Sequence, residues 1–211
     1  MQTAGRGDRV ARTREAIVAS TLTLALEGEV APIVRDIAKL AGVSARTVFQ
    51  HFADTAELYL AVLGRVLVSL VGESPDMSAQ ASLDQRIVSV IGHRASHYEQ
   101  LLPMSAFVAT LQRRSAEAAE KVGRMYSTNR EQLAKGFAPE LASLSADKRE
   151  RTLNALSMAL SPESWNVMRE RLGLTSEQAR EELRFIVKAI FTDGARAKPR
   201  YAAPALPARD P

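Results

Sequence analysis

One segment limits the possible folds of this chain more than any other, the stretch IVRDIAKLAGVSARTVFQHF from Ile33 to Phe52. Its apolar residues recur at the spacing of one face of a helix, and they are Ile33, Val34, Ile37 and Leu40. Pro32 stands where a first helical turn tolerates a missing amide, and Gly42 stands where a left-handed residue can end a helix. We therefore expect a first short helix that ends near Ala41.

A second short helix is expected directly after this turn. Ser44 can cap it, because the serine hydroxyl can accept a hydrogen bond from a backbone amide of the first turn. Val48 and Phe52 are four residues apart, so both would face inward and pack against Ile37 and Leu40 of the first helix. Two short helices joined by such a tight turn form a helix-turn-helix.

The residues left on the outer face of the second helix suit contact with DNA. They are Ala45, Arg46, Thr47, Phe49, Gln50 and His51. A helix that enters the major groove needs small residues for close approach, an arginine for guanine edges and a glutamine for adenine. Arg46 and Gln50 lie four apart on one side. An ordinary surface helix is the alternative, but the tight turn, the capping serine and the polar face favour a recognition helix.

The longer segment IVRDIAKLAGVSARTVFQHFADTAELYLAVL resembles the DNA-binding domain of TetR-family transcriptional regulators. The family pattern has an IA..AGVS core, a short recognition helix, an aromatic-x-x-Phe and a capped fourth helix, and the match runs roughly from Arg12 to Leu63. The family usually has Tyr, Lys and Thr where this chain has Phe49, Thr55 and Pro32. Each departure deletes a donor that could bind a DNA phosphate.

The resemblance implies an all-α fold and a partner. The fold would combine an N-terminal three-helix helix-turn-helix DNA-binding domain with a C-terminal helical ligand-binding and dimerisation domain. The partner would be double-stranded DNA. The candidate DNA-binding residues are Arg12, Arg35, Ser44, Ala45, Arg46, Thr47, Phe49, Gln50, His51 and Thr55.

Positive charge gathers at the two ends of the chain. The net charge is +4, while residues 1–14 and residues 196–211 each carry +3, so the middle is close to neutral. An arginine-bearing arm beside a helix-turn-helix can follow phosphates or enter a minor groove, although a merely solubilising arm would have the same composition. We expect residues 1–8 to be a disordered arm and the Pro- and Ala-rich residues 196–211 to be a disordered tail.

Composition indicates a soluble protein of the cytoplasm. The chain has 211 residues, of which 46% are hydrophobic, and it has no cysteine, so disulfides and thiolate metal sites are excluded. Its start has no apolar run of the signal-peptide kind. The longest apolar stretch, Leu58 to Val71, is broken by Gly64 and Arg65 and is too short to span a bilayer, so we expect no membrane partner.

Helical periodicity continues on both sides of this motif. A helix from Val10 to Leu26 should stop at Gly28, and a capping box of Asp54 and Glu57 should start another helix that runs to about Val71. The Gly-, Pro- and Ser-rich stretch GESPDMSAQAS then marks a domain boundary near residue 75. The expected parts are a DNA-binding domain (9–53), a connecting helix (54–74) and a ligand-binding and dimerisation domain (75–195).

The second domain should contain five further helices, namely Leu83–Leu102 stopped by Pro103, Ser115–Lys135, Ala146–Leu160, Pro162–Leu172 and Ser176–Asp193 stopped by Gly194. Arg94 falls within an apolar stripe, where it can snorkel, pair with a carboxylate or bind an anionic ligand group. Asn129 falls within a stripe of small residues, which indicates a cavity or a loosely packed core. The candidate ligand-binding residues are Arg94, His97, Tyr98, Met104, Phe107, Met125, Asn129 and Trp165.

The family pattern also implies a homodimer, in which the last two long helices pair with their symmetry mates as a four-helix bundle. The candidate interface residues are Leu153, Leu156, Leu160, Leu183, Ile186, Val187 and Ile190. The same residues could instead complete the core of one chain, because the apolar stripe on the last helix is wide. We expect dimerisation, since two-fold symmetry doubles the number of bases that a small helix-turn-helix can read.

These features predict a sequence-specific DNA-binding transcriptional regulator, a repressor that a small-molecule effector releases from a palindromic operator. One alternative is a helical scaffold or co-regulator without specific DNA binding. Another is a metal-dependent helical enzyme that uses His93 and His97, whose spacing of four can bind a metal. No third ligand and no nucleophile with its base are evident, so we expect no catalytic residue, no metal site and no cofactor.

Overall fold

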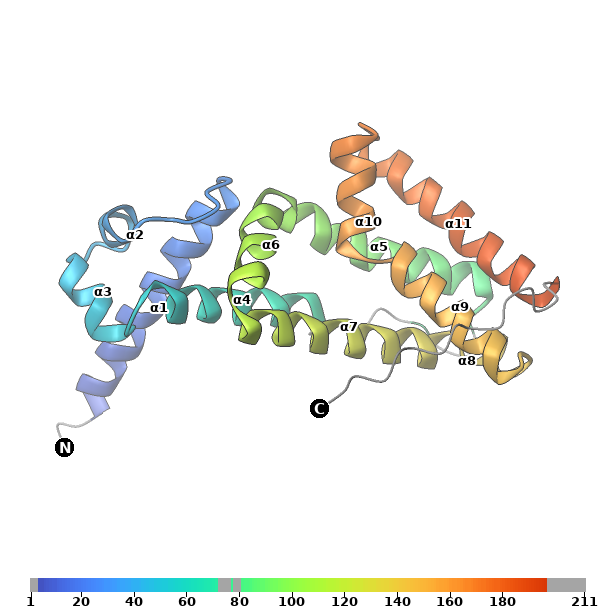
Figure 1. Cartoon of the computed structure of the whole chain (residues 1–211), viewed down its shortest axis with the longest axis horizontal. Helices are drawn as coiled ribbons and strands as arrows, with labels where there is room; N and C mark the ends of the chain where they lie inside the picture. The colour runs from blue at the N-terminus through green and yellow to red at the C-terminus, as the bar shows by residue number, and fades with distance from the viewer. Residues whose placement is uncertain (1–3, 72–76, 78–80, 197–211) are drawn as a thin grey trace, which may run out of the picture.

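Helices make up the structure, a computed structural model that describes residues 4–71, 77 and 81–196 (Figure 1). No strand occurs among these residues, so the predicted all-α fold is confirmed. None of the described helices is long and apolar enough to cross a membrane. The predicted disordered tail lies outside the described residues except for Arg196, which ends the last helix.

Four helices form the N-terminal part, namely α1 (Ala4–Leu26), α2 (Val34–Leu40), α3 (Ala45–His51) and α4 (Thr55–Val71). The first helix begins at Ala4, so the prediction of a disordered arm over residues 1–8 is wrong for residues 4–8. Extending an existing helix by one residue adds one hydrogen bond without a new nucleation step, which favours this extra turn. Residues 1–3 are outside the described part.

The turn chemistry between these helices follows the sequence closely. Gly28 and Gly42 have φ values of 96° and 67°, in the left-handed region that glycine adopts without a Cβ clash. Ser44 caps α3, since its hydroxyl accepts a hydrogen bond from the amide of Thr47 at 3.0 Å. The prediction that Pro32 lies in the first turn of this helix is wrong, because α2 starts at Val34 and the proline precedes it.

The inner face of α2 also differs from the prediction. Ile37 and Ala38 are buried there, but Leu40 is 51% exposed. At 3.6 residues per turn, Leu40 lies more than a quarter of a turn from the middle of the face that Ile37 and Ala38 form, so it stands at the edge of that face. Val48 and Phe52 of the next helix pack inward as expected, with 1% exposure each.

The C-terminal part has more elements than predicted, in the order α5 (Leu83–Leu101), the 3₁₀ helix η1 (Leu102–Met104), α6 (Ser105–Arg114), α7 (Ala116–Gly136), α8 (Ala138–Ala142), α9 (Ala146–Ala159), α10 (Pro162–Asn166), the π-helical turn η2 (Val167–Arg171) and α11 (Ser176–Arg196). The helix α5 ends at Leu101, close to the predicted stop at Pro103, but this proline lies in a 3₁₀ turn that leads into α6, a helix that was not predicted. Gly194 does not stop α11, because the helix runs on to Arg196.

Two hydrophobic cores hold these helices together. The N-terminal core contains the buried residues of α1–α4 together with those of η1, α6 and the first half of α7. The C-terminal core contains those of α5, the second half of α7, α8, α9, α10, η2 and α11. The predicted domain boundary near residue 75 therefore does not separate the two hydrophobic cores. Helix α6 and the start of α7 follow this boundary in the sequence, but they pack in the same core as the helix-turn-helix.

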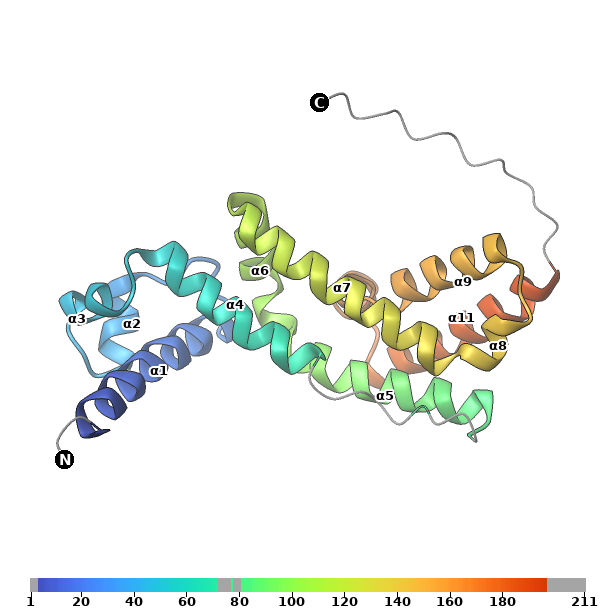
Figure 2. The ribbon, with the colours of Figure 1, turned by 90° about the horizontal axis from the view of Figure 1, so that it is seen from below.

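The arrangement of the helices separates the two ends of the molecule. Helices α2 and α3 lie at one end, and α8 with the last turns of α11 lies at the other (Figures 1 and 2). Between them, α4 leaves the helix-turn-helix and packs against α7. Helix α11 packs against α5 and α9.

The predicted dimer-interface residues need correction. Five of them are buried within the single chain at 7% exposure or less, namely Leu153, Leu156, Leu160, Leu183 and Val187. Their side chains fill the C-terminal core, and Ile190 is partly buried against it. The reason is that the wide apolar face of α11 packs against α5 and α9 of the same chain. Among the predicted set, only Ile186 is exposed, at 37%.

Candidate DNA-reading surface and ligand cavity

The outer face of α3 lies at one end of the molecule (Figure 1). Ala45, Arg46 and Gln50 are exposed there, and Phe49 is 52% exposed although it is a large apolar residue. An arginine and a glutamine on one accessible face can bind base edges, while an exposed aromatic ring can contact a thymine methyl group. These four predicted residues thus share one accessible surface.

Thr47 and His51 occupy a different face of α3. Both are half-buried, and they line a cleft with Arg9, Val10 and Thr13 of α1. The Thr47 hydroxyl lies 2.8 Å from the Ser44 hydroxyl. Both hydroxyls were predicted to bind DNA, and each already has the other as a hydrogen-bond partner. The structure therefore splits the predicted outer face into an exposed part and a part that faces α1.

The back of α3 is fixed against α1. The guanidinium of Arg14 lies over the ring of Phe52, 4.3 Å from its centroid, and its Nη2 atom lies 3.7 Å from a Glu57 carboxylate oxygen. A cation over an aromatic face is attracted by the negative charge of that face. Arg14 thereby joins α1 to the end of α3 and the start of α4, which fixes the direction of the exposed face.

Carboxylates of the chain itself occupy the start of α4. The amide of Glu57 donates to Asp54 Oδ1 at 2.8 Å, and the Glu57 carboxylate accepts from the amide of Ala53 at 2.7 Å. The predicted capping box is therefore present with one difference. The Glu57 carboxylate accepts from the amide of Ala53, where the amide of Asp54 was expected. Thr55 is half-buried beside these carboxylates. Because Asp54 already accepts from the Glu57 amide, one amide of the first turn of α4 is taken, and Thr55 still has its hydroxyl to offer DNA.

The two predicted arginines outside the motif's second helix are exposed. Arg12 projects from α1. Arg35 is 80% exposed and donates from Nε to Asp36 Oδ1 at 3.0 Å. This hydrogen bond and the Asp36 charge raise the pKa of Arg35, so the residue is a permanent cation. Both can reach a phosphate, although Arg35 would share its charge with Asp36.

A cavity of about 350 Å³ lies where the two hydrophobic cores meet. Helices α4, α5, α6, α7 and α10 border it together with η1 and η2. Its walls are mainly apolar, and the apolar side chains that line it include Leu63, Val66, Leu67, Leu70, Leu101, Met104, Val108, Val122 and Met125. Such a cavity has the size and polarity of a small-molecule site.

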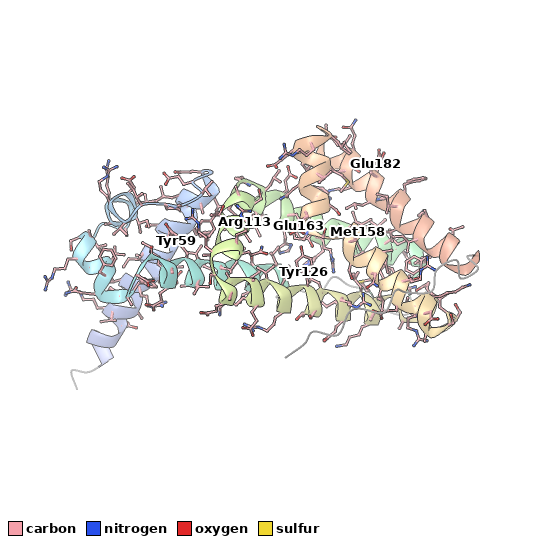
Figure 3. The ribbon with its side chains drawn as sticks, in the orientation of Figure 1. Tyr59, Arg113, Tyr126, Met158, Glu163 and Glu182 are labelled. Atoms are coloured by element: carbon pink, nitrogen blue, oxygen red, sulfur yellow. The ribbon has the colours of Figure 1, made fainter. Side chains whose placement is uncertain are left out.

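Polar side chains stand at one side of this cavity. The Tyr126 hydroxyl of α7 donates to Glu163 Oε2 of α10, and both residues line the cavity (Figure 3). Burial of the ring is the main cause that raises the pKa of Tyr126, and the hydrogen bond and charge of Glu163 raise it further. The phenol therefore keeps its proton and remains a donor across the physiological range.

Three predicted ligand-binding residues line the cavity, namely Tyr98, Met104 and Met125. Phe107 is buried in the N-terminal core, where its ring meets that of Tyr59 edge to face with centroids 5.2 Å apart. Trp165 is fully buried and donates from Nε1 to Glu99 at 3.0 Å. Both are structural residues outside the cavity lining.

Arg94 and Asn129 are also removed from the cavity lining. Arg94 is 6% exposed and donates from Nη1 to the carbonyl of Leu160 at 2.7 Å and from Nη2 to that of Asn129 at 3.4 Å. Leu160 is the C-cap of α9 and also accepts from Tyr98 at 3.0 Å. A cation there is stabilised by the negative end of the helix dipole. Arg94 thus caps a helix in place of binding a ligand or a carboxylate.

His97 is similarly engaged within its own helix. Its Nδ1 atom lies 2.8 Å from the carbonyl of His93, and the two rings are 4.5 Å apart. Across residues 4–71, 77 and 81–196, no group of three or more His, Cys, Asp or Glu residues could hold a metal ion.

Tyr126 and Glu163 were missed by sequence reasoning. They lie 37 positions apart on different helices, so no spacing rule brings them together. The helix that carries Tyr126 was predicted as Ser115–Lys135, but the partner of the Tyr126 hydroxyl was not. Only the fold places that partner.

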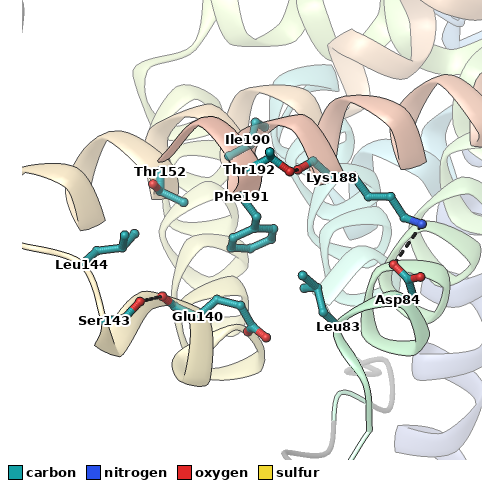
Figure 4. A pocket seen from close by; sticks show the side chains of 10 residues that line it. All are labelled: Leu83, Asp84, Glu140, Ser143, Leu144, Thr152, Lys188, Ile190, Phe191 and Thr192. Carbon is teal, nitrogen blue, oxygen red and sulfur yellow. Dashed lines mark hydrogen bonds and ion pairs between the residues drawn. The ribbon is translucent and has the colours of Figure 1, made fainter. Parts of the chain in front are cut away.

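A second cavity of about 410 Å³ lies between the start of α5, α8, α9 and α11 (Figure 4). Several of its polar groups pair with one another, although Glu140 Oε2 is buried and has no hydrogen-bond partner among the described residues. Lys188 Nζ is 2.9 Å from Asp84 Oδ1, the Ser143 hydroxyl donates to the Glu140 carbonyl at 3.0 Å, and the Glu140 carboxylate pairs with the buried Arg86. We take the cavity between the two cores as the candidate ligand site, because more helices border it and they belong to both cores.

Comparison with known proteins agrees with this geometry. Residues 22–62 match the family described as "Bacterial regulatory proteins, tetR family". No curated protein sequence matches the chain. A transcriptional regulator from a Rhodococcus species has the same fold with a TM-score of 0.69 at 17% identity, over 85% of this chain and 96% of that one.

Two further solved structures extend the likeness. A TetR-family transcriptional regulator from Streptomyces coelicolor has a TM-score of 0.72 at 16% identity, over 87% of this chain and 82% of that one. MexZ, a repressor responsible for antibiotic resistance in Pseudomonas aeruginosa, has a TM-score of 0.55 at 21% identity, over 84% and 94%. Likenesses at this identity establish a shared fold.

Proposed function

We propose that the chain is a DNA-binding transcriptional regulator, and that it is a repressor released from a palindromic operator by a small ligand. The match of residues 22–62 to the tetR-family model supports this, as does the fold shared with solved transcriptional regulators. The observation that carries this proposal is the exposed Arg46, Phe49 and Gln50 face of a capped α3 at one end of the molecule. We infer that the protein binds and does not catalyse, and that it acts in the cytoplasm.

A homodimer would present two such faces. Met158 of α9 and Phe185 of α11 are each 71% exposed, and Ile186 is 37% exposed, which supports pairing through these two helices (Figure 3). Exposed apolar side chains of this size favour contact with a partner. Two-fold symmetry would set the two α3 helices in successive major grooves, about 34–36 Å apart.

Helix α4 offers a physical route from ligand to DNA. Its second half contributes Leu63, Val66 and Leu70 to the cavity wall, while Leu58 at its start is fully buried in the N-terminal core. A ligand that changes the position of α4 would also change the spacing of the two reading helices. By linkage, operator DNA must then weaken ligand binding by the same factor as ligand weakens DNA binding.

Selection of binding sequences from a random DNA pool tests this function directly. The expected product is a palindrome whose half-sites lie about 10–10.5 base pairs apart or a multiple of that distance. A double variant, Arg46→Ala with Gln50→Ala, is the control and should enrich no common sequence. Unrelated sequences recovered with the unaltered chain would contradict specific DNA binding and favour a scaffold role.

Calorimetric titration of a ligand with and without the selected operator tests the release mechanism. Affinity for the ligand should fall when operator is present. Equal affinities would overturn the coupling while leaving the DNA binding intact.

A further inference from the structure

Glu163, Glu170 and Arg171 line the cavity between the two cores, and none of them forms an ion pair with another described residue. Of these three, Glu163 is the one that the fold holds by a hydrogen bond from another helix. Its Oε2 atom accepts the Tyr126 hydroxyl, which is neutral. Its Oε1 atom accepts no hydrogen bond from the described residues. One oxygen is therefore held in place, and the other is available.

Glu163 stands at the edge of an apolar space. It is an exposed residue, while Met125, Val122 and leucines of α4 line the same cavity. A cation that entered this space would meet an oriented carboxylate and would place its apolar part against aliphatic side chains. Charge-assisted hydrogen bonds of this kind are about twice as strong as neutral ones.

Carboxylates outnumber cations in the lining of this cavity. Arg94 is buried outside the lining, and its guanidinium donates to the carbonyls of Leu160 and Asn129. Arg171 is the cation of the lining, and it is exposed, as Glu163 and Glu170 are. The three charged side chains of the lining thus carry two negative charges and one positive charge.

We propose that the ligand of this cavity is a small apolar compound with one basic nitrogen, whose ammonium group pairs with Glu163 beside the Tyr126 hydroxyl. This proposal rests on the proposed function, because it names the chemical class of the effector. The volume of about 350 Å³ is near the lower end of the range of about 300–1,000 Å³ for small-molecule sites, so the apolar part is one chain or a small ring system.

Three compounds with the same ten-carbon chain and different head groups test the charge directly. They are decylammonium, decanol and decanoate, each titrated calorimetrically into the full-length chain at neutral pH and below its micellar concentration. Decylammonium should bind about tenfold more tightly than decanol, because it adds a charged hydrogen bond. Decanoate should bind more weakly than decanol, because its carboxylate would approach that of Glu163.

Variants identify the group responsible. Glu163→Gln keeps the shape and removes the charge, so it should bring decylammonium to within about twofold of decanol while decanol binding stays the same. Glu170→Gln is the matched control, since it removes the other carboxylate of the same lining, and it should keep most of the preference. Tyr126→Phe removes the hydroxyl but keeps the Glu163 charge, so the order of the three compounds should persist.

Each outcome decides the proposal. Equal binding of decylammonium and decanol, or an unchanged preference in Glu163→Gln, overturns the cationic class while a ligand-binding cavity stands. Loss of the preference in Glu170→Gln alone overturns the assignment to Glu163. Binding of none of the three compounds overturns the cationic class as well and counts against a ligand-responsive function, whereas the DNA selection above would be unaffected. Thermal melting of every variant confirms that the compared proteins are folded.

Discussion

The two hydrophobic cores of this protein are built on different principles. In the N-terminal core, apolar side chains such as Ile17, Ile37 and Leu58 are fully buried, and no charged side chain is buried among them in the described chain. The helices that form the C-terminal core also bury Arg86 at 2% and Arg94 at 6% exposure. The N-terminal core depends mainly on apolar packing, which is not directional. The C-terminal core also depends on hydrogen bonds, which are directional.

This difference explains where a cavity can form. Directional contacts such as Arg94 with Leu160 and Glu99 with Arg169 hold α5, α9 and η2 in one arrangement. Within the part of the chain that the structure describes, no side-chain hydrogen bond or ion pair joins α4 or α6 to these three elements. The cavity lies at this junction, so a ligand can fill it by moving α4 while the C-terminal core stays fixed.

Removal of the Glu140 carboxylate should give the largest effect. Arg86 is 3% exposed in its side chain, and Glu140→Ala leaves its charge buried without a counter-charge. We expect a loss of about 3–5 kcal/mol in the free energy of unfolding, measured by urea denaturation at a fixed protein concentration. Glu150→Ala, which removes the exposed partner of Arg130, is the control and should cost less than about 1 kcal/mol. Similar losses in the two variants would contradict the importance of buried charge in the C-terminal core.

Truncation of one leucine in each core compares their packing. Leu156 and Leu63 are both fully buried, but only Leu63 borders the cavity. Leu156→Ala should cost about 3–5 kcal/mol in the free energy of unfolding, and Leu63→Ala should cost less, about 2–3 kcal/mol, because it loses fewer neighbours. The same denaturation experiment measures both. A larger cost for Leu63→Ala would mean that the cavity is not present in solution.

A change on the DNA-reading surface should leave both cores intact. Arg46→Ala is expected to weaken binding to the selected operator by about 1–3 kcal/mol if the guanidinium reads a base. Its melting temperature should be unchanged, since Arg46 is exposed. Arg113→Ala, at an exposed arginine of α6, is the control and should bind DNA normally (Figure 3). If Arg46→Ala weakens operator and mutated sites equally, the residue contacts a phosphate.

Local sequence signals predicted the N-terminal part better than the C-terminal part. Ser44 and Gly42 act through neighbours only a few residues away, so their roles could be inferred without the fold. The burial of Leu156 and Val187 could not, because the same stripe can face its own chain or a second copy. Arg94 was ambiguous for the same reason, since its partner is the end of a helix 66 positions away.

The candidate ligand site was predictable only in part. The apolar stripes that contain Tyr98 and Met125 were visible as helical spacing, and both residues line the cavity. The pairing of Tyr126 with Glu163 depends on how α7 and α10 meet, which no local rule fixes. The helix α6 was missed because Pro103 usually ends a helix, and here it starts a 3₁₀ turn in which its missing amide is not needed.

Acid should weaken the C-terminal core through Glu99, which gives the smallest predicted effect. Its hydrogen bonds from Arg169, at 2.7 Å for the shortest, lower the pKa of Glu99 below its ordinary value of 4.5, and the bond from Trp165 lowers it further. The unfolded chain therefore takes up this proton at a higher pH than the folded chain. The stabilisation from Glu99 is present above pH 4.5 and is lost as the pH falls toward the lower, folded-state pKa.

The measurement is urea denaturation from pH 6 down to about pH 3, for the unaltered chain and for Glu99→Gln. Glu99→Gln should be less stable at pH 6, and its stability should fall less steeply below pH 4.5, because glutamine has no proton to gain. Glu131→Gln, at an exposed position of α7, is the control and should follow the unaltered chain. Parallel curves for Glu99→Gln and the unaltered chain would show that Arg169 and Trp165 do not stabilise the Glu99 carboxylate.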